Sequence, residues 1–223
     1  MGTGSIGPLV SNGQHVDLGG GYVHASGSQW VQNDHYDGSG SARGWKASVT
    51  WHFGTDTLTH LSIGAGWMSM DWTQGFNVLL SDAFELQYRI GTMETHTVQL
   101  CLFPELFVPL SRQTRFVFGA DLGWSLQAQQ HELGMETHST EYHTPSHPGG
   151  SETFAVDSTY DVDVINPFLF GIHVGFEFIP AKHWFIRADA TPMFSNIYGP
   201  KSPAQHQVYL GITAGYRFIR GKG

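Results

Sequence analysis

Residues 131–160 carry the side chains of this chain that are best suited to hold a metal ion. The segment has four His and five Asp or Glu, and it has no Lys or Arg. Imidazole and carboxylate groups are ligands for zinc, copper and nickel. The candidate ligands are His131, His138, Glu141, His143 and His147. Because no rigid spacing such as HExxH is present, a solvated acidic loop is the favoured interpretation, and capture of a divalent metal is the alternative. No other cofactor is expected.

A second group of ionisable side chains alternates with apolar residues along the chain. We call it the lumen charge network: Asp17, Lys46, Asp121, Glu177, Arg187, Asp189 and Arg217. Buried charges are costly unless they are paired, and both signs are available here. A structural network is therefore favoured over a path for protons or ions. We expect Glu177 to pair with Arg217, and we expect His60 and His173 to form hydrogen bonds rather than to act as ligands.

Two groups of residues combine His with Ser, as a nucleophile and its base would. His24 is close in sequence to Ser26 and Ser28, and His138 is close to Ser139 and Glu141. A catalytic triad also needs a third group that orients the base, and the sequence does not fix one. No catalytic residue is predicted.

Composition limits the class of protein. The 223 residues suit one domain, and a net charge of −8 argues against a nucleic-acid partner. A single cysteine, Cys101, excludes an internal disulfide and a Cys-rich metal site. The sequence contains no run of 18 apolar residues, so no transmembrane helix is predicted. The start of the chain, MGTGSIGPLV, lacks the regions of a signal peptide, so we expect any signal to have been removed; Met1 can be native or added.

Apolar residues recur with a period of two, which predicts β-strands. In Phe168–Phe178, the apolar residues at even positions alternate with Gly, His or Glu at most odd positions. Eight strands are expected, at 14–29, 44–53, 58–72, 95–108, 115–127, 168–178, 183–197 and 207–218. Short turns at 54–57, 109–113 and 180–183 alternate with longer loops at 32–41, 73–94, 131–160 and 198–206. The plan is an eight-stranded antiparallel up-and-down β-barrel, with ten strands as the alternative if FELQYRI (84–90) pairs separately.

The polar face of the strands indicates which side points inward. An eight-stranded barrel has room inside only for side chains, and the aromatic face would overfill it. We therefore expect the apolar face to contact lipid. Aromatic side chains near strand ends are typical of interfacial girdles. The predicted girdle comprises Trp51, Phe53, Trp67, Trp124, Trp184, Tyr216 and Phe218. The alternative is ordinary aromatic packing at strand ends.

Three stretches carry a family resemblance: VQLCLFPELFVPLSRQTRFVFGADLGW (98–124), INPFLFGIHVGFEFIPAKHWFIRADATPMFSNIY (165–198) and HQVYLGITAGYRF (206–218). They resemble the small, porin-like outer-membrane β-barrel proteins of Gram-negative bacteria. In that family a Gly-rich strand, a short turn with Lys, a strand with Phe-x-Arg and Ser-Asn-Ile, and a terminal Gly-Tyr-Arg-Phe occur in this order. Here IRGKG follows Phe218, which departs from a terminal aromatic residue. The resemblance implies a fold and an outer-membrane location, and little about activity.

The sequence thus predicts one outer-membrane β-barrel domain over residues 1–223, with a long acidic, His-bearing external loop at about 131–160. A structural or interaction role is expected, without catalysis. The expected contacts are outer-membrane lipid and a protein or small molecule at the external loops, with a monomeric chain. Three alternatives are a narrow pore for small solutes, a lipid-modifying enzyme and a soluble lipocalin-like binder.

Overall fold

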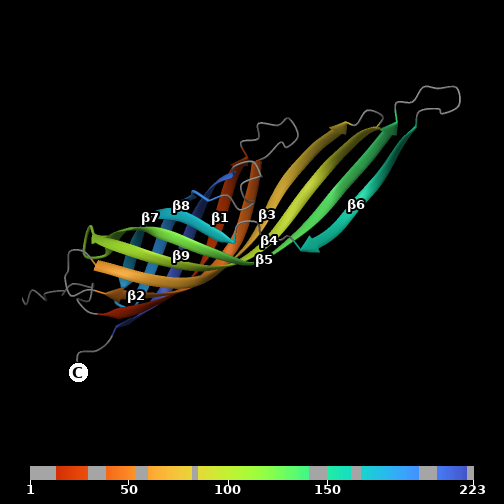
Figure 1. The fold of residues 1–223 in the computed structure, drawn as a ribbon. Helices are drawn as coiled ribbons and strands as arrows, with labels where there is room; N and C mark the ends of the chain where they lie inside the picture. The colour runs from red at the N-terminus through yellow and green to blue at the C-terminus, as the bar shows by residue number, and fades with distance from the viewer. Residues whose placement is uncertain are drawn as a thin grey trace, which may run out of the picture.

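The computed structural model describes residues 14–29, 39–53, 60–81, 85–140, 150–161, 167–195 and 205–219. These residues form antiparallel strands (Figure 1). The strands are β1 (His15–Gln29), β2 (Ser39–Phe53), β3 (His60–Ser81), β4 (Glu85–Pro109), β5 (Thr114–Thr140), β6 (Ser151–Asp161), β7 (Phe168–Ala181), β8 (Trp184–Met193) and β9 (Gln205–Ile219). Within the described ranges, no helix has the length and hydropathy needed to cross a bilayer.

Eight of the strands close into a ring. β1 pairs with both β2 and β9, and β4 pairs with β5, which joins the two ends of the sheet. β5 pairs with β7 through residues 114–124 and with β6 through residues 129–139. β6 is therefore a ninth strand outside the ring. The predicted eight-stranded antiparallel barrel is confirmed, and residues 85–90 of FELQYRI belong to β4 rather than to a separate pair.

Two segments that were predicted as loops contain long strands instead. β3 continues to Ser81 and β4 begins at Glu85, so most of 73–94 is strand; β5 continues to Thr140, and β6 occupies 151–161. Backbone pairing holds these strands together although few of their outward positions are apolar, so their mainly polar composition concealed them. The four strands project beyond the ring (Figure 1). We call residues 75–81, 85–97, 127–140 and 151–161 the blade.

Other predicted connections are partly described. Turns lie at 110–113 and 182–183, as expected, and Ser111 Oγ accepts hydrogen bonds from the backbone N–H groups of Gln113 and Thr114. Residues 39–41 of one predicted loop lie in β2, and residues 205–206 of another lie in β9. The turn at 54–57 lies outside the described residues.

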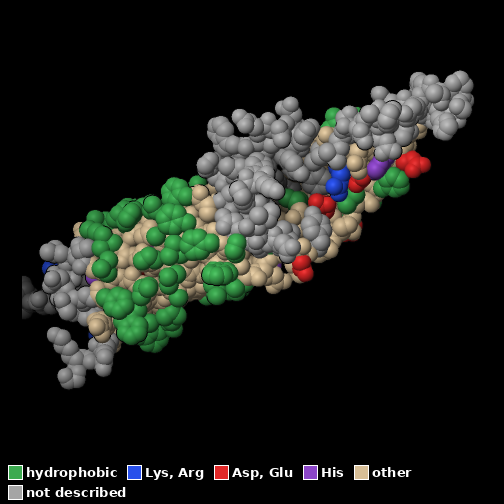
Figure 2. All heavy atoms as spheres, in the orientation of Figure 1, with side chains coloured by type: hydrophobic (Ala, Val, Ile, Leu, Met, Phe, Trp, Pro, Cys, Tyr) green, Lys and Arg blue, Asp and Glu red, His purple; other side chains and the backbone are tan. Residues whose placement is uncertain are grey.

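The ring presents its apolar face to the outside. In β7 the even positions from Phe168 to Phe178 are exposed or half-buried, while Leu169, His173 and Glu177 are buried. β2, β5 and β9 show the same alternation in the segments where it was predicted. Every strand of the ring carries exposed apolar side chains, and they form a belt on the face seen in Figure 2. This arrangement excludes a lipocalin-like binder, whose apolar face would line the interior.

The interior is filled by two layers of side chains. A hydrophobic cluster occupies the half nearer the blade: Val23, Ala25, Ala42, Met68, Met70, Trp72, Leu169, Met193 and Tyr209. Charged and polar side chains occupy the half nearer the short turns, where Asp17, His52, Arg115, Glu177 and Arg217 are all at most 1% exposed. The antiparallel register brings these residues together from strands at both ends of the chain.

Candidate functional site

Glu177 is the centre of the ionic layer. Its carboxylate is fully buried and faces three arginines: Arg217 Nη2 at 3.0 Å, Arg187 Nη2 at 3.3 Å and Arg115 Nη1 at 3.5 Å. The register explains this, because Glu177 lies directly opposite Arg115 on β5 and Arg187 on β8. The expected contact between Glu177 and Arg217 is present.

Two further carboxylates balance the arginines. Asp17 accepts hydrogen bonds from Arg217 Nε at 2.9 Å and Nη2 at 2.6 Å, a bidentate geometry that strengthens the ion pair. Glu105 accepts a hydrogen bond from Arg187 Nη1 at 2.5 Å. We call Asp17, Glu105, Arg115, Glu177, Arg187 and Arg217 the ion cluster. Its three carboxylates and three guanidinium groups leave no net formal charge.

The rest of the lumen charge network forms one separate pair and one pair that joins the ion cluster. Lys46 Nζ donates to both carboxylate oxygens of Asp189, at 2.9 and 3.1 Å. A side chain at Gly211 would clash with this pair, because its Cβ would lie 2.6 Å from Asp189 Oδ2. Asp121 contacts His173 Nδ1 at 2.9 Å and accepts a hydrogen bond from Thr191 Oγ1 at 3.0 Å. His173 Nε2 also lies 3.2 Å from Glu105 Oε1, which links Asp121 to the ion cluster. The predicted network is thus placed as two groups: the ion cluster with Asp121, and the pair of Lys46 and Asp189.

Sequence reasoning missed two members of the ion cluster. Glu105 occupies an inward position of β4, and these positions alternate with Leu100, Leu102 and Leu106. Arg115 shares its face with Val117, two positions along β5. The period-two pattern includes both Glu105 and Arg115 at inward positions. However, Pro104 interrupts the pattern next to Glu105, and Arg115 is the first residue of the strand predicted at 115–127.

A small cavity separates the ion cluster from the hydrophobic cluster. Its volume is about 60 Å³, and its lining includes Gln99, Glu105 and Arg187 on the ionic side and Met68 and Met193 on the apolar side. Such a volume holds roughly four to six water molecules. The cavity lies between two packed layers, which argues against the alternative of an open pore.

We expect the protein to show no resolved conductance steps in planar lipid bilayers. The two layers leave no wide aqueous path through the described lumen. Insertion should be verified in the same membranes by the change in electrophoretic mobility on boiling, and a large bacterial porin serves as the positive control. Reproducible unitary steps from the unmodified chain would contradict a sealed lumen.

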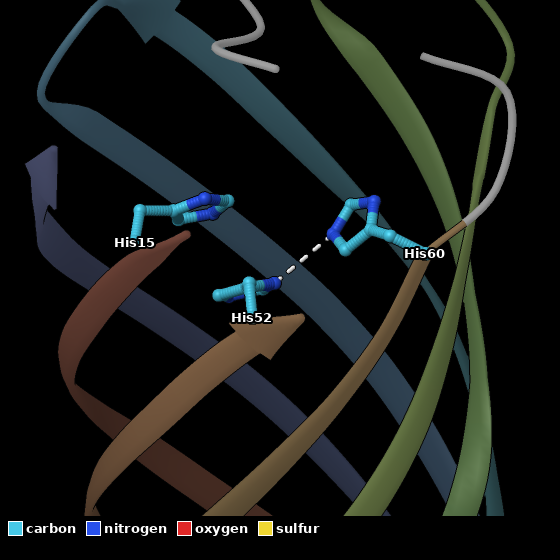
Figure 3. Close-up of side chains that lie close together, drawn as sticks. All are labelled: His15, His52 and His60. Carbon is cyan, nitrogen blue, oxygen red and sulfur yellow. Dashed lines mark hydrogen bonds between the residues drawn. The ribbon is translucent and has the colours of Figure 1, made fainter. Parts of the chain in front are cut away.

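Three histidines, His15, His52 and His60, meet at the short-turn end of the lumen, and we call them the histidine cluster (Figure 3). His15 lies opposite His52 in the pairing of β1 with β2, and their rings stack with centroids 4.0 Å apart. His52 Nδ1 lies 3.0 Å from His60 Nε2. Phe107 stacks on His60 with centroids 4.9 Å apart, and His52 Nε2 lies 3.1 Å from Asp17 Oδ2. His60 therefore forms the hydrogen bond that was predicted for it.

Polar side chains on one blade face form a local network. Arg89 contacts Glu132 at 3.2 Å and Glu136 at 3.0 Å. Glu136 also contacts His138 Nε2 at 2.6 Å and accepts a hydrogen bond from Gln87. The hydrogen bond with His138, followed by that from Gln87 and the charge of Arg89, lowers the pKa of Glu136. These contacts link β4 to β5 beyond the barrel.

The predicted metal ligands of 131–160 are not gathered by the described strands. His131 and His138 lie seven residues apart on β5, which places them on opposite faces and roughly 23 Å apart along the strand. His131 contacts Asp157 at 2.9 Å instead. These two residues therefore cannot share one ion. Glu141, His143 and His147 lie outside the described residues, and a site among them stays a prediction.

Of the His and Ser residues considered for catalysis, one pair is separated and one pair shares a face. Ser139 and His138 are consecutive on β5, so they point to opposite faces. His24 and Ser26 share the outward face of β1, and Glu141 lies outside the described residues.

The predicted girdle residues all lie on the barrel exterior, each at least 36% exposed: Trp51, Phe53, Trp67, Trp124, Trp184, Tyr216 and Phe218.

Comparison with known proteins finds similar barrels among solved structures. No model of a known protein family and no curated protein matches the sequence. Ail of Yersinia pestis, in complex with the heparin analogue sucrose octasulfate, shares 11% identity over 92% of this chain and 99% of its own, with a TM-score of 0.41. Neisserial surface protein A shares 12% over 93% and 98%, with a TM-score of 0.37. The N-terminal barrel of Pseudomonas aeruginosa OprF shares 11% over 92% and 97%, with a TM-score of 0.31.

The exterior of the ring decides what kind of barrel this is. Large apolar side chains such as Trp45, Leu61 and Ile212 are more than 60% exposed on it, and a soluble protein rarely exposes so continuous an apolar surface. The ring also pairs its backbone groups completely around its circumference, as a lipid environment requires. The chain is therefore a transmembrane β-barrel of the kind found in the bacterial outer membrane.

Proposed function

We propose that this barrel is an interaction protein that holds the blade outside the cell to bind a basic, partly apolar protein surface. Short turns mark the periplasmic end of outer-membrane barrels and long connections the external end. The blade extends from the end with the long connections (Figure 1). The observation that carries the proposal is an apolar patch on one blade face, with exposed acidic side chains beside it on the same face.

The blade patch comprises Leu79, Leu86, Ile90, Leu133 and Met135, each between 38% and 56% exposed. The register places them on one face: Ile90 lies opposite Met135, and Thr92 lies opposite Leu133. The patch lies beyond the belt, where water rather than lipid surrounds the protein. Exposed apolar patches of this kind mark protein-binding surfaces.

The charge of the blade supports a basic partner. The blade has seven Asp or Glu residues and a single Arg. Arg89 lies on the face opposite the patch, where Glu132 and Glu136 neutralise it. Glu94 and Asp157 are exposed on the patch face, and Asp157 lies directly opposite Leu133 in the sheet. Acidic side chains beside an apolar centre favour cationic partners and accelerate their association.

The blade also offers strand edges to a partner. Among the described residues, β6 pairs only with β5, and residues 75–81 of β3 pair only with β4. Unpaired strand edges can accept an extended segment of another protein by backbone hydrogen bonding. A partner segment that alternates basic and apolar residues would satisfy both the edge and the patch.

A binding measurement with defined peptides tests this function. The full chain, in nanodiscs of zwitterionic lipid, should bind a short peptide of alternating Lys and Leu, and the affinity should fall as salt rises. Replacing Leu133 and Met135 together with Ser should weaken binding by about tenfold or more, which is about 1.4 kcal/mol. Phe154→Ser, on the opposite blade face, is the matched control and should leave affinity unchanged.

Two outcomes would reject the proposed role of the patch. One is equal affinity for a Glu and Leu peptide of the same length, and the other is equal binding by the double variant and the unmodified chain. Empty nanodiscs measure binding of the peptide to lipid, which is subtracted in each case.

A further inference from the structure

We propose that the histidine cluster binds one divalent transition-metal ion, such as Zn²⁺, Ni²⁺ or Cu²⁺, at the periplasmic end of the lumen. His15, His52 and His60 each offer one ring nitrogen, and these nitrogens all lie within 4.8 Å of one another. Figure 3 shows His60 pointing toward His52, with His15 beside it. Neutral imidazole suits these borderline metals better than it suits Mg²⁺ or Ca²⁺.

The spacing of two ligand atoms is already close to that of a metal site. His52 Nδ1 and His60 Nε2 are 3.0 Å apart. Two nitrogens bound tetrahedrally to one zinc ion at 2.0–2.1 Å lie about 3.3 Å apart. The ion would replace the hydrogen bond between the two rings, and the neutral His60 ring would move its proton to Nδ1. The ring nitrogen of His15 lies within 4.8 Å of the other two, so a rotation of its side chain would complete the site.

Asp17 prepares His52 for this role. Arg217 holds Asp17 as an acceptor through two hydrogen bonds, at 2.9 and 2.6 Å. Asp17 Oδ2 lies 3.1 Å from His52 Nε2, which favours the tautomer with the proton on that nitrogen and the lone pair on Nδ1. A carboxylate that orients a ligating histidine in this way is a regular feature of metal sites.

Neighbouring side chains hold the three rings in place, and the net charge of these neighbours does not repel a cation. Phe107 stacks against His60 and lies 4.8 Å from the His52 ring, measured between centroids. The adjacent ion cluster contains equal numbers of carboxylates and arginines. His60 is only half-buried, whereas His15 and His52 are at most 4% exposed, so the cluster opens on the side of His60. Three protein ligands leave a fourth position for water or another ligand.

The experiment is a titration of the full chain in detergent with ZnCl₂, after removal of metals with EDTA. Isothermal calorimetry should give one strong site per chain, and Co²⁺ in its place should give the intense visible absorption of a four-coordinate site. His60→Ala should weaken binding by about 100-fold or more, because a lost ligand costs more than the 10- to 100-fold typical of its supporting partners. His60→Gln, which keeps a polar side chain at this position, is the second variant, and the mobility shift on boiling verifies folding.

A matched control separates this site from the segment 131–160. A variant with His131, His138, His143 and His147 all replaced by Ala should keep the strong site, and His24→Ala should also keep it. The proposal is overturned if this fourfold variant loses the strong site, if both His60 variants fold and retain it, or if the unmodified chain binds no Zn²⁺ tightly.

Discussion

Replacing Glu177 with leucine is expected to lower the free energy of unfolding by about 3 to 5 kcal/mol, the range for breaking a buried ion pair by removing one partner. Glu177 is fully buried and within 3.5 Å of three arginines. Without it, the cluster keeps three guanidinium groups and only two carboxylates. Urea unfolding in lipid vesicles, followed by tryptophan fluorescence, measures the change.

Arg115 provides the control for this effect. Its only ion pair among the described residues is the one with Glu177, and its guanidinium nitrogens make no hydrogen bond there. Arg115→Leu combined with Glu177→Leu restores equal numbers of charges, so the double variant should be more stable than Glu177→Leu alone. A double-mutant cycle then gives the coupling energy. Additive effects of the two substitutions would show that charge balance is not what Glu177 supplies.

Replacing Ile212 with arginine should cost about 2 to 4 kcal/mol, the range for a basic residue at the middle of the lipid face of a barrel. Ile212 is 62% exposed, near the middle of β9. Its side chain points outward, between the inward-facing Gly211 and Thr213. The same unfolding assay in vesicles measures the loss.

Ile212→Leu is the matched variant, since it keeps an apolar side chain of equal volume against lipid. Its stability should stay within about 0.5 kcal/mol of the parent, as for other surface substitutions that disturb no special feature. If Ile212→Arg unfolds at the same urea concentration as Ile212→Leu, this position does not contact lipid and the belt is wrongly placed.

The strands that cross the membrane were predictable because the membrane imposes a repeating pattern. Lipid selects an apolar residue at every second position, and a narrow interior selects Gly, Thr or a charge at the others, as in Phe168–Phe178. The eight-stranded ring, the face assignment and the placement of Glu177 near Arg217 follow from that pattern. The blade lacks this constraint, because water contacts both of its faces, so residues 131–140 and 151–161 resembled a loop.

The histidine cluster escaped sequence analysis for a different reason. His15, His52 and His60 come from three strands, so no local spacing joins them, unlike a motif on one element. The available signal was topological: the antiparallel pairing of β1 with β2 brings the start of β1 to the end of β2, and the pairing of β2 with β3 places the start of β3 near both. Applying the predicted strand order to each histidine would have placed all three at the short-turn end.

Closure of the ring between the first and last strands has a consequence for how the barrel folds. β1 and β9 pair along their whole length, and the bond between Asp17 and Arg217 spans 200 residues of sequence. Contacts between such distant segments form slowly, because loop closure must precede them. The ion cluster is completed only when the last strand meets the first. It therefore contributes mainly to the barrier against opening, and so to the lifetime of the folded barrel rather than to the speed of its assembly.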